Sequence, residues 1–270
     1  MSAMFKIFHR TIKAVFFLCC GVGLSVPGAG AETLTLVAAA NTVDTITSEV
    51  IVREAYRRLG IDVVIEKYPG ERALKMANGG QVAGDVQRID NLTKAYPNLI
   101  QIRPAINFIE AAVFATNTYF SIKTWEELRP HKTGIIRGIK FAEGGTKGMQ
   151  RYLASDYAGL FKMLNKKRVD VAVSPSLNGR FQMVNLGIKG IVELKPAIDR
   201  FELFHYVHSK HAALAPKLAA IFRAMKTAGQ LTAVRSHVIA KLLTPSNTTD
   251  APCVWDYDCL EKGLDFLTPR

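Results

Sequence analysis

The sequence predicts an α/β fold with two lobes, each a mostly parallel sheet flanked by helices, and a ligand cleft between them. Two observations lead to this prediction. Short runs rich in strand-forming residues alternate with segments of helical apolar spacing. One phrase also recurs, because residues 75–82 read KMANGGQV and residues 162–169 read KMLNKKRV. Each copy is typical of a helix end, a tight turn and a buried strand, so we expect two related α/β units.

The N-terminus predicts a secretory signal peptide over residues 1–31. Three basic residues precede the apolar run AVFFLCCGVGLSV, which is too short to span a bilayer. Ala29-Gly30-Ala31 then fits the small-residue pattern of a cleavage site. A lipid anchor at Cys19 or Cys20 fits less well, because bulky residues precede the cysteines. We therefore expect an exported chain that begins at Glu32 and resides in the periplasm.

The charge of the expected mature chain favours anionic partners. Of 35 Lys and Arg, three lie in the signal, which leaves 32 against 23 Asp and Glu, a formal charge of +9. Basic blocks with interleaved aromatic residues are not found, so nucleic acid is not an expected partner. Cys253 and Cys259 remain after cleavage, and in an oxidising compartment they are expected to form a disulfide.

The first lobe can be divided at its turn residues. Gly60 ends a helix that starts near Asp44, Pro69-Gly70 ends a strand, and Gly79-Gly80 ends a second helix as C-terminal glycines do. An apolar stretch at 108–117 is expected to leave this lobe as one longer strand. The expected strands are 34–39, 61–68 and 81–89, and the expected helices are 44–60 and 71–78.

The second lobe repeats this alternation, and a strand over 201–208 returns to the first lobe. Its expected strands are 133–138, 168–173 and 190–194; its helices are 157–165 and 177–187; the closing helices are 210–229 and 230–243. We expect a hinge near 115–118 and 200–204. The expected domains are a signal peptide (1–31), lobe 1 (32–116), lobe 2 (117–200), the return to lobe 1 (201–246) and a C-terminal tail (247–270).

Four stretches carry a resemblance to a known family. They are RALKMANGGQVAGD, KMLNKKRVDVAV, TGIIRG and HYVHSKHAALAPKLAAIFRAMKTAGQL. In order and spacing they resemble the family 3 extracellular solute-binding proteins, periplasmic amino-acid-binding proteins with the type II periplasmic-binding fold. The resemblance covers roughly residues 33–243. It implies a non-enzymatic protein that closes over a small polar ligand, anionic or amino-acid-like, and delivers it to the permease of an ABC transporter.

The family's ligand contacts are only partly matched here. The resemblance implies that an arginine after the first-lobe phrase binds the ligand carboxylate, and Arg88 stands there. An aspartate would follow the second-lobe strand to bind an ammonium group, but Ser174 and Pro175 occupy that place. An ordinary α-amino acid is therefore not implied.

Further ligand contacts are expected where strands end or helices begin, because ligands of open α/β sheets bind outside the carboxyl ends of the strands. Each has a structural alternative: an ion pair for Arg72 and for Arg88 with Asp85, a solvated loop for Gly138 and Lys140, a helix cap for the Asn and Ser residues, and core packing for the tyrosine. The candidates are Asn41, Tyr68, Arg72, Asp85, Arg88, Gly138, Lys140, Ser174 and Asn178.

Other functions fit the sequence less well. A metal site built from His205, His208 and His211 would require side chains that a strand points to opposite faces. An enzyme on the same scaffold would use a cleft carboxylate such as Glu110 or Glu143. A module that reports ligand to a membrane sensor remains an alternative to transport. We expect a monomer without a cofactor.

Overall fold

The structure is a computed structural model, and it describes residues 32–40, 42–116, 120–243, 263–264 and 267. These residues belong to one compact unit. The expected signal peptide and the pair Cys253 and Cys259 lie outside the described residues.

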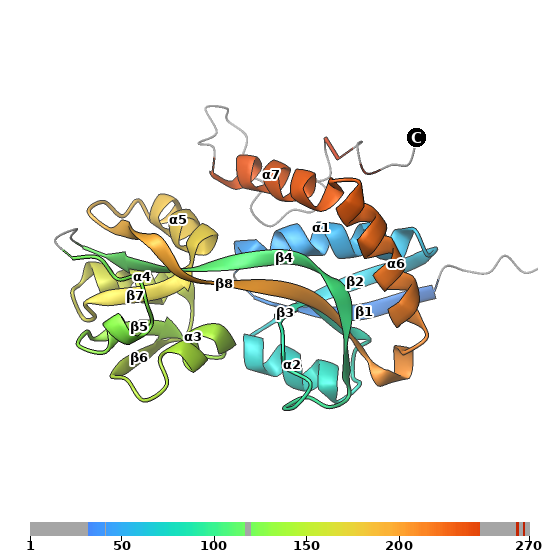
Figure 1. Cartoon of the computed structure of the whole chain (residues 1–270), viewed down its shortest axis with the longest axis horizontal. Coiled ribbons are helices and arrows are strands. Elements are labelled where there is room, and N and C mark those ends of the chain that lie inside the picture. Colours follow the sequence, from blue (N-terminus) through green and yellow to red (C-terminus); the bar gives the residue numbers. More distant parts are fainter. Residues whose placement is uncertain (1–31, 41, 117–119, 244–262, 265–266, 268–270) are drawn as a thin grey trace, which may run out of the picture. The chain divides into compact units, whose positions relative to one another are not determined.

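The described strands form one mixed sheet. In order across the sheet they are β2 (Ile61–Tyr68), β1 (Glu32–Ala39), β3 (Gly84–Ile89), β8 (Val192–His208), β4 (Leu99–Ala115), β7 (Val171–Pro175), β5 (Thr133–Ile136) and β6 (Arg151–Ala154). The pairs β1–β2, β1–β3, β5–β6 and β5–β7 are parallel, whereas the two long strands β4 and β8 pair antiparallel along their length. The fold class is therefore confirmed: parallel strands at both ends of the sheet are joined by two strands shared between the lobes (Figure 1).

Lobe 1 contains three parallel strands and four helices. Two hydrophobic clusters cover the faces of its sheet: one is built with α1, α6 and α7, and the other with α2. Its elements are β1 (Glu32–Ala39), α1 (Val43–Arg57), β2 (Ile61–Tyr68), α2 (Gly70–Asn78), β3 (Gly84–Ile89), α6 (Leu214–Thr227) and α7 (Gln230–Leu243).

Lobe 2 repeats the arrangement with shorter elements. Two hydrophobic clusters again flank its strands. Its elements are η1 (Glu126–Leu128), β5 (Thr133–Ile136), α3 (Lys140–Gly145), β6 (Arg151–Ala154), α4 (Tyr157–Asn165), β7 (Val171–Pro175) and α5 (Ser176–Asn185). The shared strands are β4 (Leu99–Ala115) and β8 (Val192–His208), and η2 (Ser209–His211) follows β8.

The crossing between the lobes lies earlier in β4 than the sequence suggested. Residues 111–115 of β4 already pair with β7, which belongs to lobe 2. Between two register shifts, Asn107–Ala111 pair with Asp199–Leu203 of β8. The two lobes meet at this stretch of β4 and β8, which is bounded on both sides by a shift in register. The sequence had also split β8 into two strands at 190–194 and 201–208, although it runs unbroken from Val192 to His208.

The recurring phrase forms the same helix end in both lobes. After α2, the N–H of Gln81 donates to Met76 O and that of Gly80 to Ala77 O; after α4, Arg168 and Lys167 make the equivalent bonds to Met163 O and Leu164 O. This pattern is a Schellman motif, which needs a residue with positive φ after the helix. That residue is Gly80 (φ 67°) in one copy and Lys167 (φ 54°) in the other.

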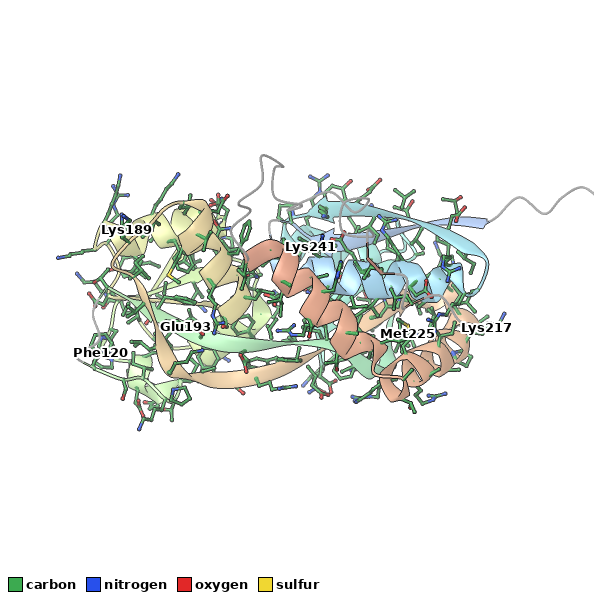
Figure 2. The ribbon with its side chains drawn as sticks, turned by 90° about the horizontal axis from the view of Figure 1, so that it is seen from above. Phe120, Lys189, Glu193, Lys217, Met225 and Lys241 are labelled. Carbon is green, nitrogen blue, oxygen red and sulfur yellow. The ribbon has the colours of Figure 1, made fainter. Side chains whose placement is uncertain are left out.

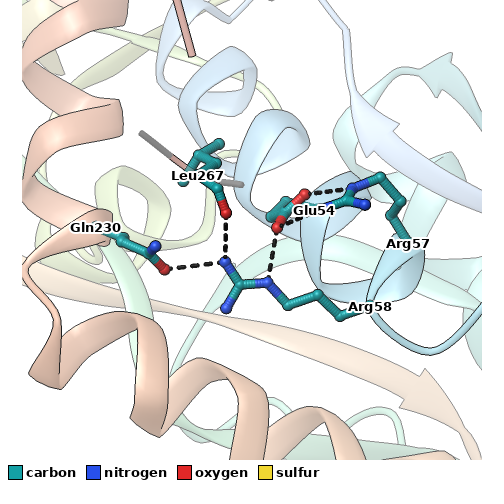
Figure 3. Close-up of polar contacts among 5 residues, drawn as sticks. All are labelled: Glu54, Arg57, Arg58, Gln230 and Leu267. Carbon is teal, nitrogen blue, oxygen red and sulfur yellow. Dashed lines mark hydrogen bonds and ion pairs between the residues drawn. The ribbon is translucent and has the colours of Figure 1, made fainter. Parts of the chain in front are cut away.

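A group of hydrogen bonds ties the end of α1 to α7 and to the C-terminal residues (Figure 3). Arg58 Nη2 donates to Gln230 Oε1 at 3.0 Å and to Leu267 O at 2.9 Å, while its Nε donates to Glu54 Oε1 at 2.7 Å. Leu264 and Leu267 are buried in the same core cluster as α1. Leu264 and Leu267 therefore pack against lobe 1 and complete its core.

Candidate functional site

A cavity lies where the carboxyl ends of strands from both lobes approach each other. Ala39 ends β1, Gln87–Ile89 close β3, Gly138 follows β5 and Pro175 ends β7. This is the position at which open α/β sheets bind ligands. The lining residues are Ala39, Thr42, Asp44, Thr45, Gln87, Arg88, Ile89, Leu92, Ile109, Gly138, Ile139, Lys140, Phe141, Tyr157, Pro175 and Leu203.

Asp44 contributes a buried carboxylate to this cavity. It lies in the first turn of α1 and is 2% exposed. Its Oδ2 has no hydrogen-bond partner among the described residues. Burial raises the pKa of Asp44 to about 7, with Arg235 opposing the shift and Glu110 adding to it. An ionised carboxylate in this position is costly unless a hydrogen-bond donor or a cation satisfies it.

Arg88 contributes a donor to the same cavity. Its Nε donates to Asp85 Oδ2 at 2.7 Å, and both side chains are buried. Burial raises the pKa of Asp85, an effect that the Arg88 charge opposes. Arg88 Nη2, in contrast, has no partner among the described residues. Asp85 thus fixes the orientation of the guanidinium group and leaves one of its nitrogens available to an acceptor.

Lobe 2 closes the cavity through direct contacts with lobe 1. Asn178 Oδ1 accepts from the backbone N–H of Val43 at 2.6 Å, and Asn178 Nδ2 donates to Thr42 Oγ1 at 2.8 Å. At the rim, Lys140 Nζ lies 2.5 Å from Glu71 Oε2. The two lobes are therefore joined beside the cavity by hydrogen bonds at the start of α1 and by an ion pair at the start of α2.

Polar side chains from β3 and β4 support the start of α1. Gln87 accepts from Ser48 Oγ at 2.5 Å and donates to Thr45 Oγ1 at 3.3 Å. Asn107 Nδ2, in the crossing part of β4, donates to Asp44 O at 3.1 Å and Ser48 Oγ at 3.2 Å. Asn107 Oδ1 accepts from Arg235 on α7. The helix turn that carries Asp44 is thus bonded directly to the segment where the lobes meet.

The structure brings together part of the site expected from the sequence. Arg88, Gly138 and Lys140 line the cavity. Asp85 lies behind Arg88, and Asn178 forms the contact between the lobes.

The remaining candidates lie elsewhere. Tyr68 donates to Glu66, and the Arg72 guanidinium carbon lies 4.7 Å from the Tyr68 ring centre; neither residue lines the cavity. Ser174 is fully buried, donates to Pro175 O and does not line the cavity either. Asn41 lies outside the described residues.

The list of candidates from the sequence omitted five polar lining residues. They are Thr42, Asp44, Thr45, Gln87 and Tyr157. The sequence did carry a signal for one of them, because an acidic residue in the first turn after the first strand marks a helix start that faces the cleft. Asp44 was interpreted only as that helix start.

One histidine and one carboxylate of the alternative functions have structural partners. His205 Nε2 lies 3.0 Å from Tyr56 Oη in the core of lobe 1, and Glu143 Oε1 accepts from Gly138 N at 2.7 Å. Within the described residues, no group of three or more His, Cys, Asp and Glu side chains is placed to hold a metal ion. None of the described helices combines the length and apolar character needed to cross a membrane.

Comparison of the sequence with known proteins finds a relative of this chain. The chain is 26% identical over 193 residues to an uncharacterized protein of Shewanella oneidensis, an alignment that spans 67% of this chain and 72% of that one. No protein-family model matches the chain.

Solved structures of similar fold include two kinds of protein. A histidine kinase sensor domain with similarity to periplasmic binding proteins matches with a TM-score of 0.67 and 17% identity, over 80% of this chain and 99% of that one. An ancestral arginine-binding protein bound to arginine matches with a TM-score of 0.66 and 14% identity, over 76% and 97%. The VFT2 domain of Bordetella pertussis BvgS matches with a TM-score of 0.59 and 12% identity, over 76% and 92%. At these identities the likeness establishes the two-lobed periplasmic-binding fold alone.

Proposed function

We propose that this protein is a receptor for a small ligand that carries both a cationic and an anionic group, and that it binds this ligand in the cavity between its lobes. The observation that carries the proposal is a pair of unsatisfied atoms on two residues that line one cavity. Asp44 Oδ2 lacks a donor and Arg88 Nη2 lacks an acceptor among the described residues. An ammonium group at Asp44 and a carboxylate at Arg88 would satisfy both.

The other lining residues narrow the ligand further. Ile89, Leu92, Ile109, Phe141 and Leu203 form an apolar wall beside the charged residues. A compact zwitterion with a short apolar portion fits this mixture of surfaces. Both charged contacts come from lobe 1, so lobe 1 binds the ligand first and lobe 2 closes over it through Asn178 and Lys140.

The partner that responds to closure is a membrane protein, and transport is the function that we infer first. The resemblance to solute-binding proteins supports delivery to the permease of an ABC transporter from the periplasm. The similarity to a histidine kinase sensor domain supports a second candidate, in which the closed protein acts on a membrane sensor. Binding without turnover is expected in both cases.

The proposal can be tested by identifying the ligand class. Native mass spectrometry of the exported protein, purified without unfolding, is expected to show a small molecule bound one to one. A thermal-shift panel of amino acids, simple amines and simple carboxylic acids at pH 8 is expected to select zwitterions. The proposal would be contradicted if a simple amine or a simple carboxylic acid raised the unfolding temperature as much as any zwitterion does. Chemical conversion of the bound compound would favour an enzyme instead.

A further inference from the structure

Lobe 2 carries an exposed group of cations around the turn that precedes β7. We define this basic turn as Lys162, Lys166, Lys167 and Arg168, at the end of α4 and in the turn before β7, together with Lys189. All five side chains are exposed, and no ion pair is found for any of them among the described residues.

The loop that carries Lys189 and the turn after α4 border the same hydrophobic cluster. Helices α4 and α5 are in contact, and Ile188, next to Lys189, packs against the cluster that contains Leu164 and Val169. We therefore group Lys189 with the four cations at the end of α4. Figure 2 shows Lys189 at the end of lobe 2 that is distant from Lys217 on α6.

The orientation of β7 separates the basic turn from the ligand cavity. The strand starts at Val171, directly after the turn, and ends at Pro175, which lines the cavity. Five residues of strand span roughly 15 Å. A partner bound at the basic turn would leave the cavity and the contacts between the lobes uncovered.

Local energetics oppose this arrangement of residues. Lys162 lies in the last turn of α4 and Lys166 caps that helix four residues later, a spacing at which like charges repel each other. Lys167 holds φ at 54°, although the equivalent turns after α2 and α5 have glycines at this position, Gly80 (67°) and Gly187 (58°). A residue with a side chain is strained in that region of backbone space. Cations near a helix C-terminus offset part of this cost, but they do not require a lysine at the strained position.

An exposed hydrophobic side chain precedes Lys189 in the chain. Val184, in the last turn of α5 just before the loop that carries Lys189, is 61% exposed, more than any other large hydrophobic residue that the structure describes. Lysines around an exposed apolar residue match the interface of a bilayer, where ammonium groups contact lipid phosphates and the apolar side chain enters the headgroup region. A specific acidic protein surface would instead favour the planar fork of arginine, and Arg168 is the one arginine of the five.

We propose that the basic turn and Val184 form a docking surface for membranes that contain anionic phospholipids. The ligand cavity stays free when the protein is docked, so the proposal is independent of what the cavity binds. Attraction to such a membrane depends on local charge and is screened by salt.

The test is sedimentation of the exported protein with vesicles. Vesicles of phosphatidylglycerol and phosphatidylcholine are compared with vesicles of phosphatidylcholine alone, at low and at high salt. The patch variant is Lys166→Glu/Lys167→Glu/Arg168→Glu. The matched control is Lys217→Glu/Arg223→Glu/Lys226→Glu, which makes the same change in net charge at exposed positions of α6. Thermal unfolding checks that each variant is folded, and Lys166→Gln/Lys167→Gly/Arg168→Gln provides a milder patch variant that relieves the strained turn.

The wild-type protein is expected to bind the anionic vesicles in a salt-sensitive manner and to ignore the neutral ones. Both patch variants should bind at least tenfold more weakly, whereas the control should stay within about threefold of the wild type. Val184→Ser should weaken binding at a given salt concentration without changing its salt dependence. Equal losses in the patch and control variants would show that only net charge matters and would overturn the proposal. Absence of preference for the anionic vesicles would overturn it too and would redirect attention to an acidic protein partner.

Discussion

The side chain of Asn178 in lobe 2 accepts a hydrogen bond from the backbone N–H of Val43 in lobe 1 at 2.6 Å. The same side chain donates to Thr42 Oγ1 at 2.8 Å, and Asn178 is only 1% exposed. One residue therefore bonds the two lobes directly beside the cavity. Its contribution belongs to the closed form, because separation of the lobes would break both bonds.

Asn178→Ala is expected to weaken ligand binding by roughly 10- to 100-fold, since it removes two hydrogen bonds and leaves the Val43 N–H without a partner. Calorimetry measures the affinity, and small-angle scattering measures the fraction of closed protein. Asn185→Ala, at an exposed position of the same helix, is the control and should bind normally. A fully closed, normally binding Asn178→Ala protein would show that this contact does not contribute to closure.

Asp44 should make the stability of the ligand-free protein depend on pH. Burial raises the pKa of Asp44 from 3.8 to about 7, so between these values the folded state holds a proton that the unfolded state has lost. Stability from this group is full below about pH 4 and is lost as the pH rises through 7, with a slope of up to about 1.4 kcal/mol per pH unit. Denaturant unfolding measures the free energy of unfolding of the wild type and of Asp44→Asn across this pH range. The variant should become increasingly more stable than the wild type as the pH rises. A difference that does not change with pH would contradict the assignment.

His205 should make the stability of the protein depend on pH in the opposite direction. Burial lowers the pKa of His205 from 6.5 to about 4. Because Val86 O can only accept, His205 Nδ1 carries the proton and Nε2 accepts from Tyr56. The contribution to stability is full above about pH 6.5 and declines as the pH falls toward 4. His205→Gln should remove this acid-side slope, whereas His211→Gln, at a less buried position, should retain it.

The strained turn in lobe 2 offers a test of the backbone argument. Lys167→Gly is expected to stabilise the protein by about 1 kcal/mol, because glycine adopts positive φ without strain. The neighbouring change Lys166→Gly, where φ is −84°, should not stabilise it. In the other copy, Gly80→Ala should be destabilising, since a Cβ there would lie 2.9 Å from His208 Cε1. Chemical denaturation compares the three variants, and a stabilising Gly80→Ala would refute the reasoning.

Local patterns predicted most of the fold. Helix α4 at 157–165 and strand β2 at 61–68 have the bounds that apolar spacing and turn residues indicated. The short strand β6 and the helix α3 were missed, because four to six residues hold too little periodicity. The first part of β4 was missed as well, since Pro104 interrupts its apolar pattern.

The site was less accessible from the sequence, because it depends on how elements distant in the chain meet. Arg88 was expected at the cleft, because a charged residue near the end of the strand after the recurring phrase is a local signal, and it lines the cavity. Tyr68 and Arg72 have the same kind of signal, but the structure places them outside the cavity. The sequence marked the start of α1 as a helix start that faces the cleft, but it did not indicate that this turn would be buried. That burial is what makes Asp44 a candidate ligand contact.

The most direct test of the proposed function is calorimetric titration, at pH 8, of the zwitterion found by native mass spectrometry or by the thermal-shift panel. The titration compares the wild type with Asp44→Asn and Arg88→Lys, and with the controls Asp62→Asn and Arg72→Lys at positions outside the cavity. We expect one-to-one binding that falls at least tenfold in each cavity variant and is unchanged in each control. Cavity variants that remain folded and bind as tightly as the wild type would contradict the proposal that Asp44 and Arg88 bind the two charged groups of the ligand.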